Sequence, residues 1–129
     1  MTLSVIGCGA MGGAMVEGWL AAGIIPPSSI TAADPCVASL ERFAGTGINT
    51  TTDNVLAAHG RDVVCVVVKP WLVEQVLGGI KDSLSGRQTL IVVAAGVSLE
   101  KVKAVVGDSI SVVLCIPNTA IAVKASMTC

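Results

Sequence analysis

The sequence predicts a doubly wound α/β protein, with a mostly parallel sheet and helices on both faces. Short apolar strands alternate with helical segments along the chain over connections of a few residues, the pattern of βαβ units. The clearest strand, 63–68, is apolar throughout, as strands are when both faces of the sheet are covered. A glycine-rich turn also separates the first strand from the first helix.

Length and composition predict one domain, residues 1–129, with enough apolar residues to form a hydrophobic core. Hydrophobic residues make up 53% of the chain, and 8 basic against 9 acidic residues give a net charge of −1. That balance gives no reason to expect a nucleic-acid or anionic-membrane partner. Charged residues are only 13%, against about 25% in ordinary domains, so we expect further protein to cover part of the surface.

Cysteine usage and hydropathy favour a cytoplasmic protein. The longest wholly apolar run is six residues, whereas a membrane-spanning helix needs about 20. Five cysteines without a C-x-x-C pair favour reduced thiols over a disulfide framework. With a single histidine in the chain, we expect no metal site.

The first half of the chain predicts three strands, each followed by a helix. The first strand ends at Gly7, and the first helix is closed by Gly23. Asn49 is the tail of a weak third strand, and Asp53 can cap a helix that Gly60 ends. The other elements are strands Leu3 to Ile6 and Ile30 to Ala33, and helices Ala10 to Ala22, Val37 to Ala44 and Asp53 to Ala58.

The second half continues the same alternation. Ser98 can cap the last predicted helix, and Pro117 stops the last predicted strand. These elements are strands Val63 to Val68, Thr89 to Ala94 and Ser109 to Ile116, and helices Trp71 to Leu77 and Ser98 to Val106.

The glycine-rich turn, residues 7–12, fits G-x-G-x-x-G and indicates a Rossmann-like dinucleotide-binding fold because of its place between strand and helix. Gly7 can make the tight turn, Gly9 lets a pyrophosphate approach the backbone, and Gly12 allows close helix–strand packing. The alternative is a tight turn that binds nothing. Cys8 is interpreted as a small space-filler rather than a reactive thiol.

Asp34 stands at the end of the second predicted strand, about 20 residues beyond Gly12, where such folds carry the residue that reads the ribose. A carboxylate there accepts hydrogen bonds from both ribose hydroxyls and repels a 2′-phosphate. No basic residue follows before Arg42, so Asp34 favours NAD(H) over NADP(H). The alternative is that Asp34 only starts a turn with Pro35.

Three further segments each follow a predicted strand, at the edge where open α/β sheets bind ligands. They are Val67-Val68-Lys69-Pro70, Ala94-Ala95-Gly96-Val97, and Pro117-Asn118-Thr119 with Met127-Thr128 downstream. With the glycine-rich turn, they resemble the amino-terminal half of a pyrroline-5-carboxylate reductase over essentially the whole chain. The alternatives are a helix start at Lys69-Pro70 and tight strand–helix packing at 94–96.

The resemblance implies a role for each segment. The glycine-rich turn would hold the coenzyme pyrophosphate, the end of the second strand would border the adenosine ribose, and later strand ends would contact the nicotinamide. Asn54 matches an asparagine that contacts coenzyme in similar reductases; its alternative is a helix cap. The implied coenzyme-binding residues are Gly7, Cys8, Gly9, Ala10, Met11, Gly12, Ala33, Asp34, Pro35, Asn54, Val67, Val68, Lys69, Pro70, Ala94, Ala95 and Gly96. The implied substrate-proximal residues are Val97, Pro117, Asn118 and Thr119.

The reaction that the resemblance implies is hydride transfer from NADH or NADPH to the C=N bond of a small cyclic imine, the last step of proline biosynthesis. In similar reductases a carboxyl-terminal helical domain supplies the imine pocket and the dimer contact. That domain is absent from the 129 residues, so we expect a coenzyme-binding half, inactive alone, with the helical domain or a homo-oligomer as partner. We expect no catalytic residue in this chain, because His59 stands at a predicted helix end.

Two alternatives stay open: a nucleotide-binding module without catalysis, and a relative of the 2- or 3-hydroxyacid dehydrogenases. Lys69-Pro70 and Pro117-Asn118-Thr119 favour the imine reductase. The chain also departs from the family pattern. Relatives often carry Ser at the position of Asp34, which strengthens the preference for NAD(H). Residues that differ from the family's Arg, Met, Pro and two Gly are Leu114, Ile116, Ala120, Lys124 and Ser126.

Overall fold

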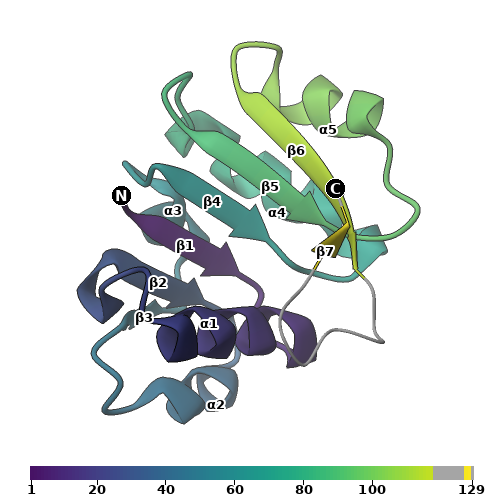
Figure 1. Cartoon of the computed structure of the whole chain (residues 1–129). Helices are drawn as coiled ribbons and strands as arrows, with labels where there is room; N and C mark the ends of the chain where they lie inside the picture. The colour runs from purple at the N-terminus through teal and green to yellow at the C-terminus, as the bar shows by residue number, and fades with distance from the viewer. Residues whose placement is uncertain (118–126, 129) are drawn as a thin grey trace.

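The computed structural model describes residues 1–117 and 127–128 of the chain. Within these residues, seven strands form one sheet in the order β3-β2-β1-β4-β5-β6-β7 (Figure 1). Strands β1 to β6 pair in parallel, and β7 lies antiparallel to β6. The strands are β1 (Leu3–Ile6), β2 (Ile30–Ala33), β3 (Asn49–Thr51), β4 (Val63–Val66), β5 (Thr89–Val93), β6 (Ser111–Pro117) and β7 (Met127–Thr128).

Helices cover both faces of the sheet, which confirms the predicted Rossmann-like class. Helices α1 and α2 lie on one face, and α3, α4 and α5 lie on the other (Figure 1). Their bounds are α1 (Ala10–Ala22), α2 (Val37–Leu40), α3 (Asn54–Ala58), α4 (Val73–Ile80) and α5 (Leu99–Val106). Short 3-10 turns occupy Pro27–Ser29, Glu41–Phe43, Pro70–Leu72 and Lys81–Ser83.

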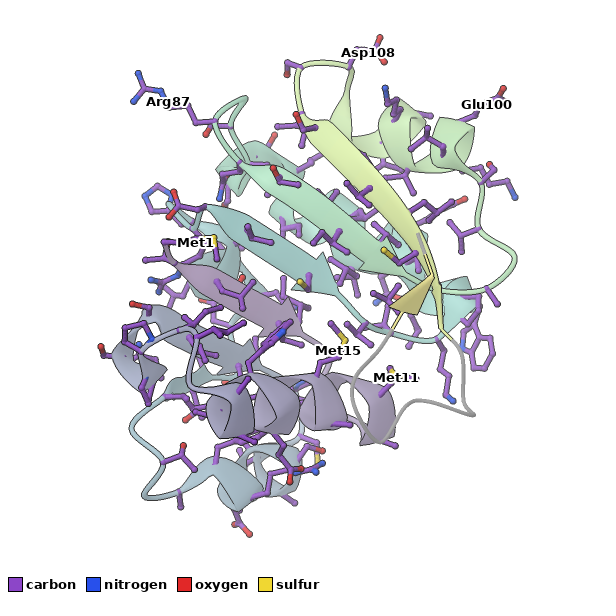
Figure 2. All side chains as sticks on the ribbon, viewed as in Figure 1. Met1, Met11, Met15, Arg87, Glu100 and Asp108 are labelled. Carbon is purple, nitrogen blue, oxygen red and sulfur yellow. The ribbon has the colours of Figure 1, made fainter. Side chains whose placement is uncertain are left out.

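Two apolar layers form the core, one on each face. Successive side chains of a strand point to opposite faces, so Val5 packs in the α1 layer and Ile6 in the α3 and α4 layer. In the α1 layer, Met15 is fully buried and Met11 packs against its edge; Figure 2 shows both on α1. In the other layer, Leu77 of α4 is fully buried. Burial on both faces explains the continuous apolar strands.

The predicted caps are confirmed. The Asp53 side chain accepts a hydrogen bond from the Val55 N–H at the start of α3, and Ser98 does the same from the Lys101 N–H at the start of α5. Gly23 ends α1 in the left-handed region, at φ 67°, where its N–H donates to the Trp19 carbonyl. A helix end that has neither a capping side chain nor a glycine carries no comparable signal in the sequence.

Several boundaries differ from the prediction because packing decides them. Asn49 begins β3 rather than ending it. Strand β4 stops at Val66, because its neighbour β1 ends at Ile6 and the chain then turns at Gly7.

Helices and the last strands differ in the same way. Helix α4 runs on to Ile80 through two glycines, because Ile80 is buried against the sheet. Helix α2 stops at Leu40 and continues as a 3-10 turn. Pro117 is the last residue of β6, one position beyond the predicted Ile116, and its pairing with Met127 in β7 was not predicted.

The described cysteines divide into two groups. Cys8, Cys36 and Cys65 are free, whereas Cys115 is disulfide-bonded, so the expectation of reduced thiols is wrong for Cys115.

In residues 1–117 and 127–128, no helix combines the length and the apolar character that a bilayer crossing requires.

Candidate functional site

The predicted site segments meet at one edge of the sheet, where the parallel strands end. The Gly7 N–H donates to the Ala33 carbonyl at 2.8 Å, which joins the ends of β1 and β2. The Val67 N–H donates to the Ile6 carbonyl, also at 2.8 Å, which joins the ends of β4 and β1. The Ala94 N–H donates to the Cys115 carbonyl at 3.2 Å on the far side of β5. The topology therefore brings to one edge residues from position 6 to position 115 of the chain.

The three glycines of the turn have the three different environments that their predicted roles require. Gly7 has φ +98°, and a Cβ on it would collide with the Val67 carbonyl. A Cβ on Gly12 would collide with the Gly7 carbonyl. A Cβ on Gly9 would meet nothing within 4 Å in the part of the chain that the structure describes. Gly7 and Gly12 are thus required by the protein itself, whereas Gly9 borders open space.

That open space lies at the start of α1, a helix of 13 residues. Gly9 is its N-cap, no side chain caps it, and its first turn holds no acidic residue. The first N–H groups of a helix lack internal acceptors and carry a partial positive charge. Among the described residues, no atom lies within 4 Å of a Cβ built on Gly9, so this side of the helix start is suited to an anion.

Asp34 lies beside the turn and uses both carboxylate oxygens on backbone donors. Its Oδ2 accepts from the Cys8 N–H and its Oδ1 from the Cys36 N–H, each at 2.8 Å. The second bond is the turn with Pro35 that the sequence offered as an alternative. The first bond, to the glycine-rich turn, has no signal in the sequence. The carboxylate is half-buried, so it also faces solvent at the strand ends.

Asn54 lies at the first position of α3, directly after β3 at the same edge. Its alternative role as a helix cap belongs instead to Asp53. The Asn54 Oδ1 atom is buried and has no hydrogen-bond partner among the described residues. A buried acceptor without a donor costs free energy, so this oxygen is suited to a ligand donor.

The ends of β4 and β5 share a cavity of about 350 Å³, which brings Pro70 together with Gly96 and Val97. Pro70 also begins a 3-10 turn, as its alternative role required. Tight packing is not the reason for Gly96, because it is exposed and a Cβ there would meet nothing within 4 Å. The sequence prediction missed Trp71, which lines this cavity and is 76% exposed. Its place in the sequence, directly after Lys69-Pro70, is the signal that could have identified it.

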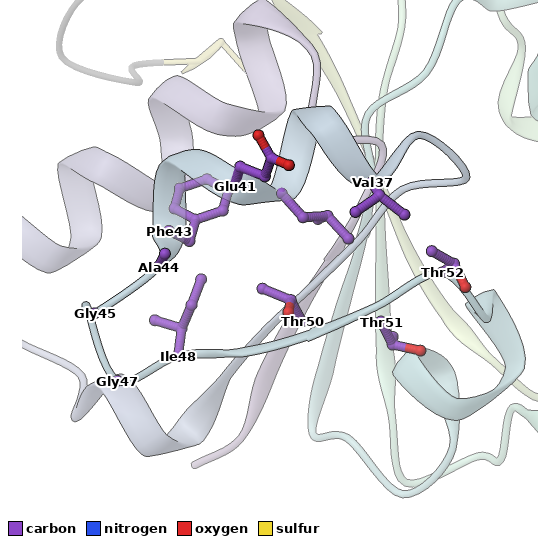
Figure 3. Close-up of a pocket in the computed structure, with 11 residues that line it drawn as sticks. Val37, Glu41, Phe43, Ala44, Gly45, Gly47, Ile48, Thr50, Thr51 and Thr52 are labelled. Atoms are coloured by element: carbon purple, nitrogen blue, oxygen red, sulfur yellow. The ribbon is translucent and has the colours of Figure 1, made fainter.

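A larger cavity, of about 900 Å³, lies between α2 and the edge strand β3 (Figure 3). Its lining is mixed: Phe43 and Ile48 contribute apolar surface, and Thr50 and Glu41 contribute polar surface. One end, at Val37 and Thr52, adjoins the Asp34 turn, because the Asp34 N–H donates to the Thr51 carbonyl. This cavity therefore extends away from Asp34, on the β3 side of the candidate site.

The remaining predicted residues divide by position. Asn118 and Thr119 lie outside the described residues, and Pro117 is described only as the last residue of β6. His59 is exposed at the end of α3, the helix-end position that the sequence predicted for it. Positions 8, 33, 35, 67, 68, 69, 94 and 95 lie at the strand ends or in the loops that follow them, and positions 10 and 11 are the first two residues of α1.

Cys8 is built into the turn as a packing residue. Its side chain is buried, and its Sγ lies 3.5 Å from the Ala33 carbonyl oxygen. Burial, together with the nearby negative charge of Asp34, raises the pKa of the Cys8 thiol to about 11. Burial alone raises the pKa of Cys65 to about 12. Both side chains are therefore neutral thiols near pH 8 and are poor nucleophiles.

We expect iodoacetamide at pH 8 to modify Cys36, which is exposed, and to spare Cys8 and Cys65. Peptide mapping by mass spectrometry measures each site, and labelling in denaturant, where all three should react, is the control. Because both pKa values are higher in the folded state, the free energy of unfolding should fall as the pH rises from 9.0 towards 11. Equal labelling of Cys8 and Cys36 in the native chain would contradict the buried packing role.

Comparison with known proteins gives a family match over most of the chain. A family model described as "NADP oxidoreductase coenzyme F420-dependent" matches residues 2–96. Pyrroline-5-carboxylate reductase from Methanosarcina acetivorans is 33% identical over 125 residues, which cover 95% of this chain and 46% of that protein. The chain spans about half the length of the curated relatives it matches.

Solved structures agree in fold. A pyrroline-5-carboxylate reductase from Coxiella burnetii superposes with a TM-score of 0.86 and 30% identity, covering 95% of this chain and 46% of that one. Pyrroline carboxylate reductase from Plasmodium falciparum, solved with NADP bound, superposes with a TM-score of 0.81 and 28% identity. That comparison covers 95% of this chain and 44% of the Plasmodium chain. These likenesses extend over nearly all of the present chain.

Proposed function

Because this chain belongs to the family described as NADP oxidoreductase, coenzyme F420-dependent, we propose that it binds a nicotinamide adenine dinucleotide at the carboxyl edge of its sheet. The observation that carries the proposal is the open space over Gly9 at the uncapped start of α1. A pyrophosphate needs both features: close access to the backbone and unpaired N–H donors. The buried, unpartnered Asn54 Oδ1 at the same edge supplies an acceptor for a coenzyme hydroxyl or amide.

Each described segment has a share in binding. The turn from Gly7 to Gly12 binds the pyrophosphate, and Asp34 faces the adenosine ribose. The exposed backbone at Ala95 and Gly96 leaves room for a flat ring against the end of β5. When bound, the coenzyme supplies a hydride. The role of this chain is to hold the hydride donor at the strand ends, in one orientation, beside the cavity lined by Trp71 and Val97.

The reaction that we propose for the whole protein is reduction of the C=N bond of pyrroline-5-carboxylate, a small cyclic imine. The names of the similar proteins support this substrate. Residues 1–129 would form the dinucleotide-binding domain, and a helical domain would complete the imine pocket. The proposed site residues in this chain bind and orient, since His59, an exposed residue at a helix end, is not placed to donate a proton.

The coenzyme preference is a finer proposal. Asp34 favours NAD(H), because its carboxylate lies where a 2′-phosphate would add a second negative charge. Arg42, the first basic residue after Asp34, forms an ion pair with Glu17 of α1 and stacks over the Phe43 ring at 5.5 Å. Its charge is thereby largely balanced and held against α1. We expect NADH to bind about tenfold more tightly than NADPH.

Isothermal titration of NADH and NADPH into the purified chain tests the proposal, followed by an imine-reduction assay on the same sample. We expect binding of at least one coenzyme without turnover. Binding with turnover would mean that these residues contain the whole site. Binding without turnover in a full-length protein would favour the nucleotide-binding module. Binding of neither coenzyme would reject the proposed function and leave a glycine-rich turn that only shapes the fold.

A further inference from the structure

We propose that Asp34 is a positioning residue that holds the glycine-rich turn in its binding conformation, in addition to any contact with a ribose. This inference rests on the proposed function only for its consequence, coenzyme affinity. The positioning itself is a property of the free chain. The starting point is the hydrogen bond from the Cys8 N–H to Asp34 Oδ2, which joins residues 26 positions apart.

Asp34 is itself held on three sides, so it can act as a fixed acceptor. Its Oδ1 accepts from the Cys36 N–H, which sets the plane of the carboxylate. Its own N–H donates to the Thr51 carbonyl at 3.2 Å. The preceding residue, Ala33, is fully buried and accepts from the Gly7 N–H. The ends of three strands therefore determine where this carboxylate lies.

The Cys8 N–H has Asp34 as its acceptor, so this bond holds the Cys8 backbone from outside the glycine-rich turn. Gly7 and Gly9 flank it, and glycine gives the backbone the widest conformational freedom. The Cys8 side chain points inward, with Sγ near the Ala33 and Val5 carbonyls at 3.5 and 3.9 Å. The inward side chain and the Asp34 carboxylate together fix the Gly7–Cys8 peptide and so the direction in which the chain enters Gly9. That peptide determines how the pyrophosphate would meet the start of α1.

Substitutions of Asp34 then have two separable effects. A carboxylate offers about four acceptor sites, so two remain for ribose hydroxyls after the two backbone donors are bound. Serine carries one short hydroxyl and cannot span both donors. Asp34→Ser should relax the preference against NADPH and, at the same time, loosen the turn that both coenzymes share.

Amide hydrogen exchange measured by NMR tests the positioning directly. In the unsubstituted chain, we expect the Cys8 amide to exchange about tenfold more slowly than the Gly9 amide, relative to their intrinsic rates. In Asp34→Ser, exchange at Cys8 should rise about tenfold. Asp53→Ser is the matched control, because Asp53 also accepts from the N–H two residues on and carries the same charge. It should leave exchange at Cys8 unchanged.

The consequence for binding is tested with 2′,3′-dideoxyadenosine diphosphate, which carries a pyrophosphate and no ribose hydroxyl. Asp34→Ser should weaken its binding about fivefold or more, whereas a residue that only reads the ribose would leave it unchanged. Unprotected Cys8 in the unsubstituted chain, or equal exchange in Asp34→Ser, would overturn the proposal. The exchange measurement on the unsubstituted chain decides the question even if Asp34→Ser does not fold. If no coenzyme or diphosphate binds, the proposed function fails while the exchange result still judges the positioning.

Discussion

Gly12→Ala is expected to lower the free energy of unfolding by about 3 kcal/mol or more, because the new Cβ has no space. It would collide with the carbonyl of Gly7 and lie 3.4 Å from the Val5 side chain. Backbone at the end of β1 cannot move without disturbing its bonds to β2 and β4. Urea unfolding followed by circular dichroism measures the loss. Coenzyme affinity should fall with it, because α1 would shift relative to the turn.

Gly13→Ala, one position along the same helix, is the matched control. A Cβ at Gly13 would meet the guanidinium of Arg42, the far end of a flexible side chain that can move away. The exposed ion pair with Glu17 contributes at most about 1 kcal/mol. Alanine recovers roughly 0.5–1 kcal/mol of helix stability over glycine, so the net change should be small. Equal losses in Gly12→Ala and Gly13→Ala would contradict the packing role of Gly12.

Gly9→Ala is expected to separate binding from stability. Its Cβ would meet no atom of the described residues within 4 Å, and its φ of −71° suits alanine. The free energy of unfolding should therefore change by less than about 0.5 kcal/mol. The methyl group would occupy the space through which the pyrophosphate approaches, so NADH and NADPH should each bind about 100-fold more weakly. Calorimetric titration and urea unfolding on the same preparation measure both quantities.

Gly79→Ala in α4 provides the comparison for Gly9→Ala. A Cβ on Gly79 also meets none of the described atoms within 4 Å, and the residue lies in the last turn of α4. It should leave coenzyme affinity unchanged and raise stability slightly. Unchanged affinity in Gly9→Ala would show that the turn does not hold the pyrophosphate, although the fold would stand.

The candidate site was predictable from the sequence where a residue's role depends only on its neighbours in the chain. A glycine between a strand and a helix signals a turn with close contacts, and the structure confirms distinct environments for Gly7, Gly9 and Gly12. The same holds for Asp53 and Ser98, because a helix cap acts within three residues of itself. The exposed place of His59 follows from the helix end that the sequence marks.

The site was not predictable where a side chain chooses between distant partners. The sequence offered two roles for Asp34, ribose reading or a turn with Pro35, and the structure shows the turn together with a bond to Cys8. The sequence also offered Asn54 as a helix cap, but Asp53 caps α3 instead. The Asn54 Oδ1 atom is buried without a hydrogen-bond partner among the described residues. Trp71 was passed over because its exposure depends on the cavity beside Gly96.

By itself the sequence determined the order of strands and helices, the parallel doubly wound class and the turn at 7–12. Apolar periodicity, caps and glycines act over a few residues, and short right-handed crossovers leave few arrangements for such a chain. Only the tertiary structure decided where β4 ends, how far α4 runs and what Asp34 binds. Those outcomes depend on which distant strand ends and buried surfaces come into contact, and no local pattern encodes that contact.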